Sequence, residues 1–284
     1  MTYNETNEKQ NLDSVIPPFA FFGGPEISVD FLHELEKNDT TPALIVTTPD
    51  RPSGRKMLLT SPAVKTWADE REIPVLQPEK LRDIYDQLTS LDLFVVVAYG
   101  KIILQSILDI PEFGSVNLHP SLLPKYRGPS PILSALLADD RETGISLMVL
   151  DALMDHGPII AQKNITVDEW LPNRQMEQWF AQVGAKLFIE SITDYLADPS
   201  SVSEQDHELA TECHKFSKSD MEIDLSNSRQ SYLQYLAFDK PFFFHNNERI
   251  IVTDAEFVDG KFIINKIVPA GKKEIRWTDH QLRN

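Results

Sequence analysis

Asn117 and His119 lie two residues apart at the end of a short apolar run. On a β-strand this spacing places both side chains on one face. Pro120, Pro124 and Gly128 then prevent a strand or a long helix from continuing, so the polar pair is expected where a strand ends. A neutral amide donor beside an imidazole that can carry a proton suits a carbonyl group whose oxygen becomes negative during reaction. An Asn-x-His pair alone also fits ordinary turn and core roles, so the surrounding pattern decides.

Asp155 is the third candidate for chemistry, in a loop that follows an apolar run and precedes Gly157. A carboxylate close to an imidazole orients the ring and stabilises its protonated form. We therefore expect His119 to meet a developing oxyanion as a cation, while Asp155 takes up a proton directly or through water. The alternative for Asp155 is an aspartate that caps its own loop. His156 is expected to face solvent, because successive residues normally point apart.

Strand-like and helix-like segments alternate before residue 203, and this alternation predicts how the candidate residues are positioned. Expected strands cover 18–22, 43–48, 74–76, 91–97, a run ending at 119, 144–150 and 159–167. Expected helices cover 27–37, 61–71, 79–90, a short segment ending at 108, 131–139 and 171–197. The pattern predicts an α/β fold with a Rossmann-like, doubly wound and mainly parallel sheet. Ligands bind at the carboxyl edge of such sheets, where Asn117 and His119 are expected.

The composition changes around residues 197–215, where the sequence becomes polar. Residues 1–15 are polar and without periodicity, so we expect a loose tail there. Residues 16–203 are expected to form the larger, catalytic domain. Residues 204–284 are expected to form a small β-rich, barrel-like but reduced domain, with strands at 241–245, 249–253 and 261–265.

The overall composition excludes several classes of protein. Cys213 is the single cysteine, so no intrachain disulfide forms and a cytoplasmic location is expected. The seven histidines are scattered without ligand spacing, so no metal site is expected. The sequence has neither an apolar leader nor a run of about 18 apolar residues, so no membrane association is expected. The net charge of −16 argues against a generic nucleic-acid binder. NAD and ATP sites are disfavoured because G-x-G-x-x-G and Walker sequences are absent.

Local basic residues depart from this acidic average. The segment 49–56 contains Arg51, Arg55 and Lys56 together with two prolines and a glycine, which predict a loop. Such a spot can attract phosphate, although a solvated charged loop is the simpler alternative. The segment 271–276 is expected to be an exposed turn or tail. Arg127 is expected either to hold an anionic ligand or to fix its loop to nearby carboxylates.

Four strings in fixed order carry a resemblance to a known family. They are Pro-Asp-Arg-Pro-Ser-Gly-Arg at 49–55, Val-Val-Val-Ala-Tyr-Gly at 95–100, Asn-Leu-His-Pro-Ser-Leu-Leu-Pro followed by Arg-Gly within 117–128, and Met-Asp-His-Gly-Pro-Ile at 154–159. Together they resemble the 10-formyltetrahydrofolate-dependent formyltransferases. The 49–55 string resembles, within that superfamily, the methionyl-tRNA formyltransferases.

The resemblance implies that the methionyl amine attacks the formyl carbon directly, without an acyl-enzyme. Asn117 and protonated His119 would stabilise the oxyanion, while Asp155 would support His119 and assist proton removal. Cys213 would not act as a nucleophile, and no metal would be required. The formyl donor, 10-formyltetrahydrofolate, would be bound by the 98–102 turn, the loop after Asn117 and a nearby strand end, namely Ala98, Tyr99, Gly100, Ile102, Ser121, Leu122, Leu123, Pro124 and Leu150.

The acceptor implied by the resemblance is methionyl-tRNA, bound by a monomeric enzyme. The C-terminal part looks shorter than the family's barrel domain and is net acidic, with 11 basic and 14 acidic residues in 204–284. We therefore expect tRNA to be held chiefly by Arg51, Arg55 and Lys56. Weaker contributions are expected from Lys272, Lys273 and Arg276.

Two other functions remain open at this point. The first is a sugar-nucleotide or other small-amine N-formyltransferase that uses the same folate, against which the 49–55 string argues. The second is a folate- or RNA-binding protein without turnover. The intact set of Asn117, His119 and Asp155 argues against this second reading.

Overall fold

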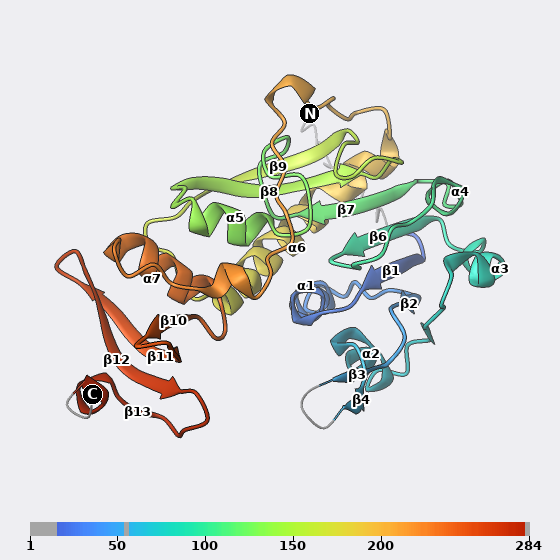
Figure 1. Ribbon diagram of the computed structural model, residues 1–284. Helices are drawn as coiled ribbons and strands as arrows, with labels where there is room; N and C mark the ends of the chain where they lie inside the picture. Colours follow the sequence, from blue (N-terminus) through green and yellow to red (C-terminus); the bar gives the residue numbers. More distant parts are fainter. Residues whose placement is uncertain (1–15, 54–56, 282–284) are drawn as a thin grey trace, which may run out of the picture.

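The computed structural model describes residues 16–53 and 57–281, and a seven-stranded sheet forms the centre of its larger part (Figure 1). The strand order is β5-β2-β1-β6-β7-β8-β9. The strands are β1 Phe19–Gly23, β2 Leu44–Val46, β5 Val75–Leu76, β6 Leu93–Val97, β7 Ser115–His119, β8 Glu142–Val149 and β9 Ile159–Thr166. β8 is antiparallel to both of its neighbours, and the other neighbouring strands are parallel. The predicted Rossmann-like, mainly parallel sheet is confirmed.

Helices cover both faces of this sheet. One face packs against α1 Glu26–Glu36, α2 Ala63–Asp69, α5 Pro131–Leu137 and α6 Asn173–Ala197. The opposite face packs against η1 Leu81–Ile84, α3 Tyr85–Leu88 and α4 Gln105–Leu108. The predicted segment 79–90 is therefore a 3₁₀ turn followed by a short α-helix. This two-sided burial explains why the β6 sequence is apolar throughout.

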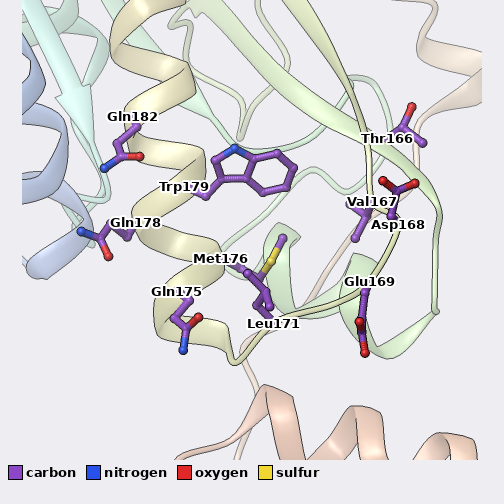
Figure 2. A pocket seen from close by; sticks show the side chains of 10 residues that line it. All are labelled: Thr166, Val167, Asp168, Glu169, Leu171, Gln175, Met176, Gln178, Trp179 and Gln182. Carbon is purple, nitrogen blue, oxygen red and sulfur yellow. The ribbon is translucent and has the colours of Figure 1, made fainter.

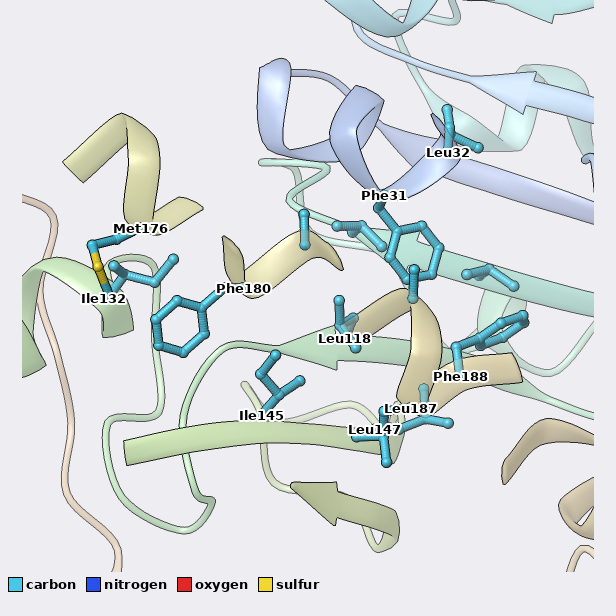
Figure 3. Packing of buried hydrophobic residues seen from close by; sticks show 14 of the residues in the cluster. Phe31, Leu32, Leu118, Ile132, Ile145, Leu147, Met176, Phe180, Leu187 and Phe188 are labelled. Carbon is cyan, nitrogen blue, oxygen red and sulfur yellow. The ribbon is translucent and has the colours of Figure 1, made fainter. Parts of the chain in front are cut away.

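The core beneath α6 fixes the direction of the β7 side chains. Leu118 lies in this core with Ile145 and Leu147 of β8, under Phe180 and Phe188 of α6 (Figure 3). Because neighbouring residues of a strand point to opposite faces, the two residues that flank Leu118 face away from α6.

Although α6 is 25 residues long, no helix within the described residues is apolar enough along its length to cross a bilayer.

The C-terminal part contains a separate antiparallel sheet in the order β10-β11-β12-β13, reached through α7 (Figure 1). Its elements are α7 Ser228–Ala237, β10 Phe242–His245, β11 Glu248–Val258, β12 Lys261–Pro269, β13 Ile275–Arg276 and α8 Trp277–Gln281. The predicted β-rich character is confirmed. The helix α7 was not predicted, although Asn227 caps it by accepting a hydrogen bond from the Gln230 N–H. The division into 1–15, 16–203 and 204–284 stays a prediction, and 1–15 lies outside the described residues.

An ion pair joins α7 to the larger part of the chain. The Arg229 guanidinium contacts the Asp139 carboxylate at 2.6 Å, and this contact holds the pKa of Asp139 below its usual value. Arg229 also lies over the ring of Phe257 in β11, with its guanidinium carbon 5.5 Å from the ring centre. Arg229 therefore contacts both the larger part of the chain and the C-terminal sheet.

Two segments predicted to be irregular contain strands. In the 49–60 segment, β3 Arg51–Ser53 pairs with β4 Leu58–Thr60 as an antiparallel hairpin. In the 271–276 segment, β13 pairs with β12. The loop prediction was wrong at Arg51–Ser53, and the prediction of an exposed turn was wrong only at Ile275–Arg276, because short strands next to proline, glycine and lysine carry little local signal. Their conformation depends on a pairing partner, which is β4 for β3 and β12 for β13.

Candidate active site

Asn117 and His119 are buried at the end of β7, with exposed fractions of 8% and 4%. Both face away from α6, on the side where Met148 of β8 lies opposite Asn117. The Asn117 amide makes no hydrogen bond with another described residue. Buried amides normally make hydrogen bonds. Because the Asn117 amide makes none with these residues, it is available to hydrogen-bond a bound ligand.

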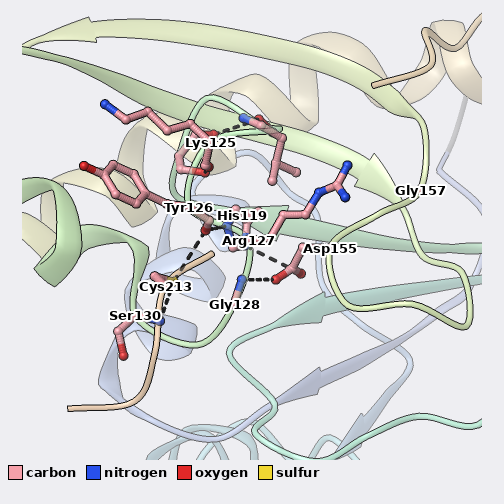
Figure 4. Close-up of polar contacts among 12 residues, drawn as sticks. His119, Lys125, Tyr126, Arg127, Gly128, Ser130, Asp155, Gly157 and Cys213 are labelled. Carbon is pink, nitrogen blue, oxygen red and sulfur yellow. Dashed lines mark hydrogen bonds and ion pairs between the residues drawn. The ribbon is translucent and has the colours of Figure 1, made fainter. Parts of the chain in front are cut away.

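His119 is held at both ring nitrogens (Figure 4). Its Nε2 lies 2.9 Å from the carbonyl oxygen of Tyr126, and its Nδ1 lies 3.6 Å from Oδ1 of Asp155. A carbonyl oxygen can only accept, so Nε2 carries the hydrogen. Nδ1 therefore faces the carboxylate, which suits a ring that is protonated when negative charge develops nearby.

Asp155 reaches this point by an indirect route. Because β8 is antiparallel to β7, it ends beside the beginning of β7, where Leu150 N–H donates to the Ser115 carbonyl at 2.7 Å. The loop 150–158 then returns toward His119. There Gly128 N–H donates to Oδ2 of Asp155 at 2.7 Å. Asp155 itself adopts a positive φ of 49°, a conformation that aspartate tolerates better than most residues.

The loop after His119 is fastened to β8 and β9. The Ser146 hydroxyl donates to the carbonyl of Ser121 and accepts from the N–H of Leu123, at 2.7 and 3.0 Å. Gln162 donates to the carbonyl of Leu123 at 2.9 Å. Ser121 and Leu123 are thus buried supports of the loop. The remaining predicted folate contacts of this loop, Leu122 and Pro124, are partly exposed.

The 98–102 turn has both buried and exposed members. Ala98 and Gly100 are exposed and have positive φ, and the Ile102 side chain is 88% exposed. Tyr99 is instead buried against Phe22, with ring centres 5.4 Å apart, and burial raises the pKa of its phenol to about 12. Leu150, predicted with this group, is half-buried beside β7.

The predicted tRNA-binding cations differ in their availability. Arg51 is exposed on β3 and forms no ion pair with a described residue, whereas Arg55 and Lys56 lie outside the described residues. Lys272 pairs with Glu248 at 3.1 Å. The other two predicted cations are Lys273 and Arg276, and both are exposed.

The segment 203–213 lies across the site loops and was not predicted to take part in the site. Gln205 is buried, with 6% exposed, and its amide contacts both the Arg127 side chain and the loop that carries Asp155. The partners of Arg127 are Gln205 and His207, and neither is a carboxylate. His156, expected to face solvent, is partly exposed but also makes two contacts with the protein. Its ring stacks on that of His207 with centres 4.1 Å apart, and its Nδ1 lies 2.7 Å from Asp151.

Cys213 supports the site loop from this same segment. Its N–H donates to the carbonyl of Arg127 at 2.7 Å, and Ser130 N–H donates to its Sγ at 3.3 Å. Burial raises the pKa of the Cys213 thiol, so little thiolate is present at neutral pH. A packing role accounts for these contacts.

A further hollow lies away from these loops. A cavity of about 690 Å³ is bordered by the end of β9 and the first turns of α6, including Trp179 and Gln182 (Figure 2). The described residues that line it include no histidine, cysteine, serine or lysine. No group of three or more histidine, cysteine, aspartate or glutamate side chains that could hold a metal ion occurs in the described part of the chain. Asn117, His119 and Asp155 are therefore the candidate catalytic residues.

A family model described as formyl transferase matches residues 19–192, which include these three side chains. The chain belongs to the formyl transferase family.

Relatives of this formyl transferase chain carry a more specific name. A methionyl-tRNA formyltransferase of Chloroflexus aurantiacus is 40% identical over 210 residues, covering 72% of this chain and 68% of the relative. One from Staphylococcus epidermidis is 33% identical over 292 aligned residues, covering 92% of this chain and 94% of the relative. The solved N-formyltransferase of Helicobacter canadensis, in complex with folinic acid and dTDP-3-aminofucose, shares the fold. Its TM-score is 0.59 at 20% identity, covering 92% of this chain and 99% of that one.

Gly128 of this formyl transferase lies where the site loop meets the 203–213 segment. A Cβ atom at this position would lie 2.3 Å from the carbonyl oxygen of Cys213, and the φ of 123° is unfavourable for other residues. We expect Gly128→Ala to lower the free energy of unfolding by roughly 2–6 kcal/mol, the sum of backbone strain and overpacking. Urea denaturation measures this loss.

Gly260→Ala is the matched control for Gly128→Ala. Gly260 also has a positive φ, of 74°, but no atom lies within 4 Å of a Cβ built there. Its replacement should cost only the conformational preference of glycine, about 1 kcal/mol. Equal losses for the two variants would contradict the tight contact with Cys213.

Proposed function

We propose that this chain transfers the formyl group of 10-formyltetrahydrofolate to the α-amino group of methionyl-tRNA. Its membership of the formyl transferase family and the names of its curated relatives support this substrate pair. The observation that carries the proposal is the meeting of His119 and Asp155 beside the Asn117 amide, which hydrogen-bonds to no other described residue.

The side chains of the site suit a direct acyl transfer. The amine nitrogen attacks the formyl carbon, a C–N bond forms, and the formyl oxygen becomes an oxyanion. The Asn117 amide donates a hydrogen bond to that oxyanion, and the protonated His119, whose ring nitrogens face Tyr126 and Asp155, stabilises it through its positive charge. Asp155 accepts the proton that the amine loses, directly or through water. The intermediate then collapses: the C–N10 bond breaks, N10 takes up the proton held by Asp155, directly or through water, and the formylated amine remains.

The surface around the site offers places for both substrates. The exposed backbone of Ala98 and Gly100, the side chain of Ile102 and the half-buried Leu150 support a donor site beside β7. Apolar and backbone groups of this kind suit a flat heterocycle. Tyr99, Ser121 and Leu123 are buried, so we propose that they shape this donor site from behind, with Leu122 and Pro124 at its border.

For the acceptor, we propose that the hairpin β3–β4 contacts the tRNA backbone. Arg51 is exposed on this hairpin, and Arg55 and Lys56 belong to its connecting sequence. Lys273 and Arg276 are exposed and form no ion pair with a described residue, so they can add contacts, whereas Lys272 would first have to leave Glu248. The chain otherwise carries net negative charge, so tRNA should bind through few phosphates and with a modest dependence on salt.

Arg51→Ala should raise the KM for methionyl-tRNA several-fold and leave the KM for 10-formyltetrahydrofolate within about twofold. Loss of one phosphate contact should also reduce the salt dependence of tRNA binding by a slope of about one. Steady-state kinetics at several salt concentrations measures both effects. Arg82, whose side chain is 70% exposed, provides the control variant Arg82→Ala, which should match the wild type. Equal losses for the two substrates would indicate that Arg51 is structural.

One assay tests the proposed function. The purified chain is incubated with 10-formyltetrahydrofolate and either methionyl-tRNA or a set of amino sugars, and the formylated products are quantified. Formylmethionyl-tRNA as the main product supports the proposal. Formylated sugar would favour a small-amine formyltransferase, and folate binding without any product would favour a non-catalytic role. We further propose that the enzyme acts as a cytoplasmic monomer, which sedimentation at working concentration would test.

A further inference from the structure

Gln205 joins the two loops that form the reacting part of the site. Its Oε1 accepts hydrogen bonds from Nε and Nη2 of Arg127, at 3.1 and 2.6 Å. Its Nε2 donates to the carbonyl oxygens of Asp155 and Gly157, at 3.0 and 2.7 Å. A glutamine amide has two N–H groups and two lone pairs on oxygen, so all of its hydrogen-bonding positions are used.

These contacts close a ring around Asp155. Arg127 precedes Gly128, whose N–H holds the Asp155 carboxylate at 2.7 Å. The Asp155 carbonyl is held by Gln205 on the other side. Gln205 therefore holds the Asp155 carbonyl directly and the Asp155 carboxylate through Arg127 and Gly128. These two links fix the carboxylate in relation to His119. Such fixing is needed because Asp155 has a positive φ, which a free loop would leave readily.

The backbone on either side of Gln205 is itself held in place. Ser203 exchanges two hydrogen bonds with Ile159 at the start of β9, at 2.8 and 2.9 Å. Farther along, Thr211 accepts from the N–H of Arg127 at 2.8 Å, and Cys213 donates to the carbonyl of Arg127. The amide of Gln205 is therefore presented from a braced segment, and it belongs to residues beyond the 19–192 family match.

We propose that Gln205 is a positioning residue for formyl transfer, setting the Asp155 carboxylate against His119 by linking Arg127 to the 155–157 backbone. This inference rests on the proposed function for its kinetic consequence. Gln205 does not touch the reacting atoms. It acts through Asp155, so its loss should change kcat far more than the KM of either substrate.

Gln205→Glu tests this role with nearly unchanged shape. Glutamate retains an oxygen for Arg127 but replaces the N–H donors by a second oxygen, which would face the carbonyls of Asp155 and Gly157. We expect kcat to fall by roughly 10- to 100-fold, since small misplacements of a reacting group have effects of this size. Both KM values should stay within about twofold. Hydrogen exchange of the 150–158 amides should accelerate, while β6 and β7 amides remain protected.

Gln234→Glu is the matched control, because Gln234 also bridges backbone groups, donating to the Glu222 carbonyl and accepting from Asp224 N–H, away from the site. Its kcat should equal that of the wild type. In the Asp155→Asn background, adding Gln205→Glu should cost less than about twofold, because a residue that acts only through Asp155 has nothing left to position.

Two kinetic results would overturn the inference: a kcat for Gln205→Glu within twofold of the wild type, or losses that multiply in the double variant. Should Gln205→Glu fail to fold, Gln205→Met is judged by the same criteria. If neither folds, Gln205 belongs to the fold alone and the inference is wrong. Absence of product from the wild type would refute the proposed function, while hydrogen exchange would still report whether Gln205 holds the 150–158 loop.

Discussion

Asp155→Asn is expected to lower kcat by roughly 10²–10⁴-fold, the range for loss of a positioned acid–base group. The amide oxygen of asparagine can still accept the hydrogen bond that Gly128 N–H now donates to Oδ2, so the loop should keep its shape. A neutral amide, however, neither takes a proton from the attacking amine nor stabilises the charge of His119, 3.6 Å away. Single-turnover formylation with saturating substrates measures the chemical step directly.

Asp151→Asn provides the control for Asp155→Asn within the same loop. The Asp151 carboxylate also contacts an imidazole, that of His156, at 2.7 Å. Nothing places this pair at the reacting formyl group, so kcat should stay within a few-fold of the wild type. If the two variants were equally impaired, the loop's charge as a whole would be responsible, and the specific role of Asp155 would be wrong.

The features that the sequence predicted correctly depend on local periodicity. Alternation along β7 sends Val116 and Leu118 into the α6 core, so the two polar residues must share the other face. The uninterrupted apolar stretch of β6 indicated a strand covered on both sides, as the two core clusters show. Signals of this kind need no information about distant parts of the chain. They therefore also predicted the succession of the sheet strands and of the helices that cover them along the chain.

The features that were missed depend on contacts between distant residues. Gln205 lies in a polar stretch that looks like a linker, and its partner Arg127 is 78 residues away. The stacking of His156 on His207 likewise requires a partner that no periodicity identifies. The reversed direction of β8 was not foreseen either. It explains why Asp155 needs a long returning loop, and hence an external brace, to reach His119.

The predicted folate contacts also show the difference between what a local motif indicates and what packing decides. Motif strings identify a stretch of chain, but only packing decides which side chains within it are open. In the 98–102 turn the ring of Tyr99 enters the core while Ile102 remains exposed. In the loop after His119, the backbone groups of Ser121 and Leu123 hydrogen-bond to Ser146 of β8, and Leu123 packs against Met148 of the same strand. Backbone and partly exposed groups are therefore the better candidates for donor contacts.

Asn117→Ala is expected to reduce kcat by roughly 10²–10³-fold, the usual consequence of losing one oxyanion donor. The reason lies in what the amide does not do in the free protein: it forms no hydrogen bond with another described residue. Its removal should therefore change the free energy of unfolding by less than about 1 kcal/mol. An ordinary core or turn asparagine would behave in the opposite way, losing stability while kcat was retained.

Ser115→Ala, in the same strand, is the control that distinguishes a catalytic role of Asn117 from a structural one. Ser115 lies two residues earlier on the same face of β7, and its hydroxyl donates to the Leu108 carbonyl at 3.1 Å. Its loss should cost about 1 kcal/mol of stability and leave kcat within about twofold. Urea denaturation and formylation kinetics on both variants would thus give crossed effects, one on stability and one on turnover. A turnover number for Asn117→Ala within a few-fold of the wild type would mean that the oxyanion is stabilised elsewhere, and Asn117 would be a structural residue.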